Sequence, residues 1–367
     1  MGAPIDPAAA SRADELCDAA LAGDRRALAR LLTAVENRTA VAEAAMRRLH
    51  SLAGHAQLVG ITGPPGAGKS TLVAALIAEL RASGRPVAVV AVDPSSPITG
   101  GAVLGDRVRM QAYAGDDGVF IRSMASRGHS GGLSSTTAAA AAVFDAAGFD
   151  LVLIETVGTG QSEVEVAATA DTTVVVEAPE MGDEIQAIKA GLLEVADIIA
   201  VNKGDLPGSH RTAAQLRAML SDGVGRAVRP REVAAGEMAG TREAADPGGV
   251  AAARGVAAPR GVAGPGFTPP KNPDVLVVTA ATGDGVADLL AAIDRHRDAG
   301  ASLGSEARLR RADAQVWTVL SDRLRGRVTA LEAAGDPRAS ALLDAVAAHD
   351  MDPFEAADRL LALLTRE

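Results

Sequence analysis

The feature most informative about the fold of this chain is the stretch Gly63-Pro64-Pro65-Gly66-Ala67-Gly68-Lys69-Ser70. It follows an apolar run at 58–62 and leads into 71–80, which has the composition of a good helix. Glycines let backbone N–H groups close around phosphate oxygens, and the N-terminus of a helix adds partial positive charge. Strand, glycine-rich turn and helix together predict a phosphate-binding loop. In it, Lys69 reaches the β and γ phosphates and Ser70 ligates Mg²⁺, and Thr71 is a further candidate nucleotide contact.

Outward from this loop, short apolar runs alternate with amphipathic stretches. The runs that we expect to form strands are 58–62, 87–92, 119–121, 151–154, 174–176, 198–201 and 275–278. Strands that are apolar on both faces and separated by helices are typical of a parallel sheet covered on both sides. The pattern predicts an α/β fold, a P-loop NTPase with a mostly parallel, doubly wound sheet. Ligands are expected at the carboxyl ends of its strands.

A second motif concerns the base of the nucleotide. Asn202-Lys203-Gly204-Asp205 directly follows one of the expected strands. A carboxylate can accept hydrogen bonds from both N1–H and the exocyclic amine of guanine, a donor pair that adenine lacks, so Asp205 is the candidate base reader. We expect Asn202 and Lys203 to brace the loop and cover the base. Thr279-Ala280-Ala281 follows the last expected strand and could present a backbone N–H to the guanine carbonyl, so the two segments together predict GTP.

Acidic residues are expected near the γ-phosphate. Asp93 and Glu155 each end an expected strand, where a carboxylate holds Mg²⁺ directly or through water; an acidic helix cap is the alternative. The N–H of Gly158 is placed to sense the γ-phosphate. Small GTPases carry a water-orienting glutamine immediately after this glycine, but here Thr159 follows and Gln161 comes two residues later. This predicts slow intrinsic hydrolysis that a partner accelerates.

Composition narrows the classes of function. The chain has 367 residues, of which 48% are hydrophobic, and a formal net charge of −10. An acidic chain is repelled by nucleic-acid backbones and anionic lipid, so we expect neither as a partner. We find no secretory signal at the N-terminus and no apolar run long enough to span a bilayer. Cys17 is the only cysteine, which excludes an intrachain disulfide and a multi-thiolate metal site and fits a cytoplasmic location.

The domain organisation follows from changes in pattern. Residues 1–54 are expected to form an N-terminal helical segment, and 55–300 the P-loop domain. Within that domain, 233–268 is rich in Ala, Gly, Pro and Arg without a sustained period, which indicates a flexible insertion rather than an ordinary ordered loop. No strand pattern returns in 301–367, a helical extension in which Asp352 is expected to cap a helix. This extension needs a surface to pack on, in its own domain or in a second subunit.

With these motifs placed, the chain resembles the methylmalonyl-CoA mutase-associated GTPases. These are cobalamin-trafficking G-protein chaperones that were long labelled arginine/ornithine transport ATPases. The likeness runs from about residue 15 to 230 and resumes near 268. The matching segments are Gly63–Thr71, Asp93–Pro97, Gly100–Met110, Arg122–Gly128, Glu155–Glu163 and Asn202–Asp205.

The resemblance implies properties that the motifs alone do not. It implies a fold like that of the GTPases related to signal-recognition-particle proteins, which dimerise, so that 301–367 becomes a dimerisation arm and the chain a homodimer. It implies that Asp93 and Asp106 act near Mg²⁺. It also implies that the segment Met181–Lys189 relays the nucleotide state to the mutase. The candidate relay residues are Asp183, Gln186 and Lys189.

We therefore expect a cytoplasmic GTPase that cycles between GTP and GDP with Mg²⁺. It would gate the loading and protection of adenosylcobalamin on an acyl-CoA mutase, with methylmalonyl-CoA mutase as the first candidate. Three alternatives stay open at this point. They are a GTPase metallochaperone for another metalloenzyme, an ATP-driven transport-associated kinase or ATPase, and a scaffold that binds nucleotide without hydrolysing it.

Overall fold

The computed structural model describes residues 6–93, 113, 115–125, 132–156, 166, 169–179, 195–227, 273–302 and 304–365. Within these residues seven strands form one sheet in which all neighbouring strands are parallel, in the order β3-β2-β4-β1-β5-β6-β7. The strands are β1 (Gln57–Thr62), β2 (Val87–Asp93), β3 (Val119–Ala125), β4 (Leu151–Thr156), β5 (Thr172–Glu177), β6 (Ile198–Val201) and β7 (Asp274–Val277). The expected parallel α/β fold is confirmed.

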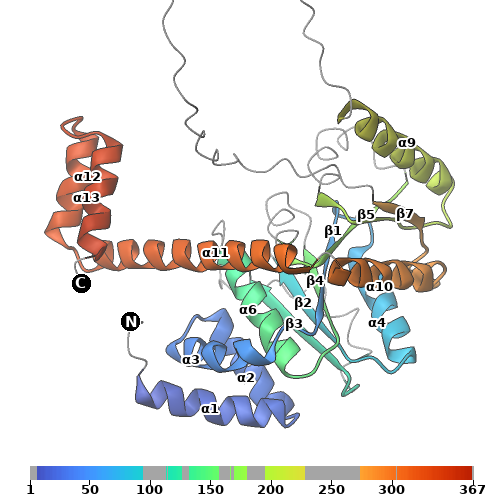
Figure 1. Cartoon of the computed structure of the whole chain (residues 1–367), viewed down its shortest axis with the longest axis horizontal. Coiled ribbons are helices and arrows are strands. Elements are labelled where there is room, and N and C mark those ends of the chain that lie inside the picture. Colours follow the sequence, from blue (N-terminus) through green and yellow to red (C-terminus); the bar gives the residue numbers. More distant parts are fainter. Residues whose placement is uncertain are drawn as a thin grey trace, which may run out of the picture.

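Helices cover both faces of this sheet, which is why every residue of β4, β5 and β6 is buried. On one face, α4 (Lys69–Ala82) and α10 (Val286–Ser302) share a core with alternate residues of β1, β2 and β4. On the other face lies α6 (Gly132–Ala146), as Figure 1 shows. A smaller core joins α9 (Ser209–Ala227) to β6 and β7. The carboxyl end of β1, at the centre of the sheet, is thus enclosed from both sides.

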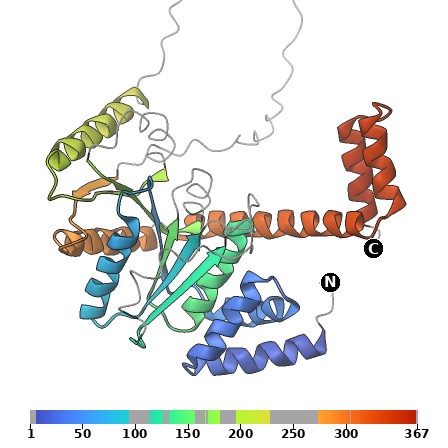
Figure 2. The same ribbon diagram turned by 180° about the vertical axis from the view of Figure 1, so that it is seen from behind.

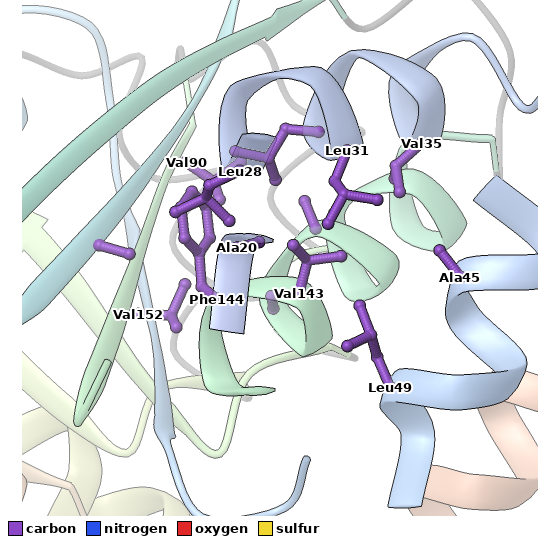
Figure 3. Close-up of a cluster of buried hydrophobic side chains, with 14 of the residues drawn as sticks. Ala20, Leu28, Leu31, Val35, Ala45, Leu49, Val90, Val143, Phe144 and Val152 are labelled. Carbon is purple, nitrogen blue, oxygen red and sulfur yellow. The ribbon is translucent and has the colours of Figure 1, made fainter. Parts of the chain in front are cut away.

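Three helices precede the sheet: α1 (Pro7–Leu21), α2 (Arg25–Glu36) and α3 (Ala40–Leu49), with the short 3₁₀ helix η1 (His50–Leu52). Helices α2 and α3 pack on α6, and α1 packs on α2 and α3. Leu28, Leu31 and Leu49 from these helices lie against Val143 and Phe144 of α6 (Figure 3), all of them buried. Each such side chain contributes about 1.5–3 kcal/mol of transfer free energy. The shared core therefore runs from α1 to α6, and a boundary at residue 54 stays a prediction.

The N-terminal helices are also tied to the edge strand β3. The guanidinium of Arg25 donates hydrogen bonds to the carbonyls of Asp117 and Val119, at 3.0 and 2.7 Å, and lies 5.1 Å from the ring centroid of Phe120. Arg122 forms an ion pair with Glu36 of α2. This pairing explains why β3 continues to Ala125, past the predicted end of its apolar run at residue 121: the arginine is neutralised by a distant helix.

The C-terminal helices form an arm that leaves the sheet. Helix α11 (Gly304–Ala333) has 30 residues and is about 45 Å long at ~1.5 Å per residue. Beyond it, α12 (Pro337–Ala347) and α13 (Pro353–Thr365) pair at its far end (Figures 1 and 2). Asp352 accepts hydrogen bonds from the N–H groups of Phe354 and Glu355, so it caps α13 as predicted.

Candidate nucleotide-binding site

The phosphate loop joins β1 to α4 and depends on glycine at two positions. Gly63 has φ +135° and Gly68 has φ +93°, both in the region that side chains disfavour. A Cβ at Gly63 would lie 2.1 Å from the carbonyl oxygen of Val176, and a Cβ at Gly68 would lie 2.3 Å from Nδ2 of Asn202. Neither position can take another residue without moving backbone or the asparagine. The loop is thus shaped by β5 and by the motif that follows β6.

Lys69, the first residue of α4, folds back over this loop and is buried. Its Nζ donates hydrogen bonds to the carbonyl oxygens of Gly63 and Pro64, at 2.8 and 3.1 Å. The ammonium therefore lies inside the curve of the loop, where phosphate oxygens would compete with these carbonyls for its protons. Pro65 and Gly66 are exposed at the tip, and Ala67 is buried beneath them.

The first turn of α4 is bonded to the end of β4. The Ser70 hydroxyl donates a 2.6 Å hydrogen bond to Oε1 of Glu155, whose side chain is buried. A hydroxyl and a carboxylate are hard oxygen donors of the kind that Mg²⁺ prefers, so the pair fits a magnesium site. Asp93 is the last residue of β2, which pairs in parallel with β4. It therefore lies at the same carboxyl end of the sheet as Glu155. Its side chain is outside what the structure describes.

The Asn202 side chain connects the two halves of the site. Its Nδ2 donates to the carbonyl of Ala67 at 2.9 Å, and its Oδ1 accepts from the N–H of Ala280 at 3.0 Å. The residue is only 3% exposed, so these bonds form away from competing water. One amide thereby holds the phosphate loop and the Thr279–Ala281 loop in fixed relation.

The loops that follow β6 and β7, which are expected to contact the base, also expose residues to solvent. Lys203 has φ +57° and is half-buried, and Asp205 two residues later is exposed. In the facing loop, the N–H of Thr279 donates to the carbonyl of Asp284 at 2.8 Å. Ala281 is exposed, and its N–H has no hydrogen-bond partner within the described residues. The loop after β6 thus presents an exposed carboxylate, and the loop after β7 presents an available N–H beside Ala280.

The chain is similar to known proteins over most of its length. The sequence model of the family described as methylmalonyl Co-A mutase-associated GTPase MeaB matches residues 28–333. The chain belongs to the MeaB family. A protein of Pyrococcus abyssi that is named as a GTPase is 41% identical over 353 residues, 95% of each chain. The mouse methylmalonic aciduria type A homolog, a mitochondrial protein, is 38% identical over 206 residues, 52% of this chain and 50% of the mouse protein.

A solved structure agrees with the fold over the whole length. The crystal structure of an LAO/AO transport system kinase is 25% identical, covers 99% of each chain and superposes with a TM-score of 0.60. MeaB membership and this likeness identify the chain as a GTPase with a P-loop fold. None of the helices in the described ranges combines the length and apolarity that a bilayer crossing needs.

Several predicted residues of this MeaB-family chain cannot be placed. The N–H of Gly158, the side chain of Asp106 and the whole relay segment lie outside the described residues, as do Thr159, Gln161 and the insertion 233–268. The relay residues concerned are Asp183, Gln186 and Lys189. Conversely, the sequence reasoning missed Thr62 and Thr156, two buried threonines whose hydroxyls meet at the edge of the site. Their one sequence signal is position, since each ends a strand that leads into a nucleotide motif.

Proposed function

We propose that this MeaB-family GTPase is a chaperone that gates adenosylcobalamin loading and protection of methylmalonyl-CoA mutase or a related acyl-CoA mutase. The observation that carries the proposal is the family match over residues 28–333, because the family is described by its association with that mutase. The mouse relative is named for methylmalonic aciduria, which points to the same metabolite. A cytoplasmic location fits the single, buried Cys17.

GTP and Mg²⁺ are the proposed ligands, and the site offers a group for each part of them. Lys69 would exchange its two carbonyl partners for phosphate oxygens, and Asp205 would accept the hydrogen bonds of guanine. Ser70 and Glu155 would hold Mg²⁺, with Asp93 and Asp106 as further candidates. When bound, the metal would neutralise charge that develops on the phosphates.

We further propose slow intrinsic turnover with stimulation by the mutase. Thr159 stands where small GTPases carry their water-orienting glutamine, so the isolated chain lacks that group at that position. Intrinsic turnover on the order of 1 per second or faster would contradict this proposal. Asp183, Gln186 and Lys189 are the proposed relay, and Lys189→Ala should weaken stimulation by the mutase while intrinsic turnover stays unchanged.

A homodimer formed through the arm is the proposed assembly. Helix α11 exposes several apolar side chains, which would remain in contact with water in a monomer. They are Leu309, Val316, Trp317, Val319 and Leu320. The helix carries six arginines against four carboxylates, whereas 337–365 carries two arginines against five carboxylates. A pocket of about 500 Å³ lies beside α11 and is lined by residues that include Leu320, Leu324 and Arg327. It could accommodate a side chain of the second copy. The charges favour a second copy whose α12–α13 pair lies along this helix.

The alternatives differ in nucleotide or cargo. An ATP-driven transport component fits the name of the LAO/AO transport system kinase, but a carboxylate at Asp205 has no donor pair to bind on adenine. A GTPase metallochaperone for another metalloenzyme would share the phosphate and base loops. Only the identity of the client separates it from a mutase chaperone.

Cofactor transfer tests the proposal. Apo-mutase, adenosylcobalamin and this protein would be mixed with GTP, GDP, a non-hydrolysable GTP analogue or no nucleotide, and loading followed by cobalamin absorbance. We expect the rate or extent of loading to depend on the nucleotide, and Lys69→Ala to remove that dependence. Identical loading under all four conditions would contradict a gating role, even if GTP were hydrolysed.

A further inference from the structure

A buried hydroxyl pair joins the ends of the two central strands. Oγ1 of Thr156, the last residue of β4, donates a 3.2 Å hydrogen bond to Oγ1 of Thr62, the last residue of β1. Thr62 is 0% and Thr156 1% exposed, so water does not compete for this bond. Thr62 directly precedes the phosphate loop, and Thr156 directly follows Glu155. The bond therefore connects two segments that lead into the site.

The Thr62–Thr156 bond is one of two side-chain hydrogen bonds that hold the end of β4. Side chains alternate across the sheet, so Glu155 lies on the α4 face and Thr156 on the α6 face. On the α4 face Glu155 accepts from Ser70 at 2.6 Å, and on the α6 face Thr156 donates to Thr62. The end of β4 is thus bonded from both faces to the two elements that flank the phosphate loop.

Packing alone does not require hydroxyls at these two positions. Valine has the shape of threonine, and two buried valines would avoid the cost of removing two hydroxyls from water. The surrounding strand ends are rich in valine, as in Val174–Val176 of the neighbouring β5. What the threonines add is a directional bond that fixes how β4 lies against β1 at this level of the sheet.

We propose that Thr62 and Thr156 are positioning residues for GTP hydrolysis, which hold the end of β4, and with it Glu155, in fixed relation to the phosphate loop. Neither threonine touches the nucleotide in this account. They act through the Ser70–Glu155 bond, because groups that stabilise a transition state must be held to within about half an ångström. The proposal rests on GTP as the substrate of the site.

The test compares Thr156→Val with Thr156→Ser in single-turnover and steady-state hydrolysis. We expect Thr156→Val to lower kcat by about 10- to 100-fold with KM and GDP affinity changed less than about twofold. Thr156→Ser restores the hydroxyl and should return kcat to within about threefold of wild type. If the pair acts as one unit, Thr62→Val and the double variant should show the same loss as Thr156→Val.

Thr137→Val on α6 is the matched control. Thr137 is 1% exposed and its hydroxyl has no hydrogen-bond partner among the described residues, so its loss should leave kcat unchanged. Wild-type kcat in a folded Thr156→Val variant, equal losses in Thr156→Ser and Thr156→Val, or additive losses in the double variant would each overturn the proposal. If Thr156→Val does not fold, wild-type kcat in Thr62→Val overturns it instead. Failure of the GTP assignment would look different, since the wild-type chain would then bind ATP as tightly as GTP.

Discussion

The Ser70 hydroxyl donates a hydrogen bond to Oε1 of Glu155 across 2.6 Å, and this bond joins the helix that follows the phosphate loop to the carboxyl end of β4. The two residues are 85 positions apart in the sequence. The bond brings together two of the residues predicted to serve Mg²⁺, although they come from segments far apart in the sequence.

Glu155→Gln should keep the fold and lose hydrolysis. The amide oxygen can still accept from Ser70, so packing is preserved, but the negative charge that attracts Mg²⁺ is gone. We expect GTP turnover at 1 equivalent of Mg²⁺ to fall by about 10- to 100-fold, with partial recovery as Mg²⁺ is raised. Steady-state hydrolysis across a magnesium titration measures this, and a variant with wild-type rate and wild-type magnesium dependence would show that Glu155 has no role at the metal.

Asp205→Asn should change which base is bound. The asparagine amide replaces one acceptor with a donor, which opposes the guanine amine and suits the carbonyl that xanthine carries at the same position. We expect affinity for GTP to fall by about 10- to 100-fold and affinity for the xanthosine nucleotide to rise. Competition titrations with fluorescent nucleotides give both constants. Unchanged GTP affinity would remove Asp205 from the base site, and ATP binding as tight as GTP in the wild type would remove the guanine assignment itself.

Asn202→Ala should destabilise the protein even without nucleotide. It leaves the carbonyl of Ala67 and the N–H of Ala280 without their partner, and each such buried group costs about 1–3 kcal/mol. Urea unfolding of the nucleotide-free protein measures the loss. The control is Asp205→Ala, three residues away and exposed, which should change stability by less than about 0.5 kcal/mol. Equal stability of the two variants would mean that the hydrogen bonds of Asn202 do not contribute to the free energy of unfolding.

Val316→Glu should prevent self-association through the arm. Val316 is 65% exposed, so the charge costs little in the monomer, but it would be buried in a dimer that covers this side of α11. Gln315→Glu, the same charge on the preceding residue of α11, which is also exposed, is the control. Sedimentation would give the assembly state, and emission of Trp317, the one tryptophan of the chain, should shift to shorter wavelength as wild-type protein is concentrated. A wild-type chain that stays monomeric at high micromolar concentration would contradict the arm proposal.

Most of the fold could be predicted because it is written in local patterns. The seven apolar runs became strands with ends that differ by at most two residues, apart from β3. There, Arg122 interrupts the apolar pattern, and its partner Glu36 lies 86 residues away on α2, so no local signal announces that the strand continues. The strand order and the packing of α2 and α3 on α6 depend on the same kind of distant contact. The sequence analysis also gave no indication that α11 is one continuous helix.

The site was predictable where a motif carries the chemistry and not where side chains meet across the fold. The phosphate loop and the Asn202–Asp205 motif were found from spacing. The bonds from Asn202 to Ala67 and Ala280 span 135 and 78 residues, and they exist only once β1, β5, β6 and β7 have assembled in this order in the sheet. The Thr62–Thr156 pair is of the same type, because the position of each threonine at the end of a strand does not show that the two hydroxyls meet.

GTP turnover with and without the apo-mutase shows whether this chain is a GTPase that a mutase regulates. Phosphate release by the wild-type chain would be measured alone, with the apo-mutase and with an unrelated protein, and Lys69→Ala would serve as the inactive control at each step. We expect slow release by the chain alone, a rise of at least about tenfold with the mutase only, and no release above background from Lys69→Ala. Two results together would contradict the assignment of this chain as a mutase chaperone. Turnover would be the same with and without the mutase, and cobalamin loading of the mutase would not depend on the nucleotide.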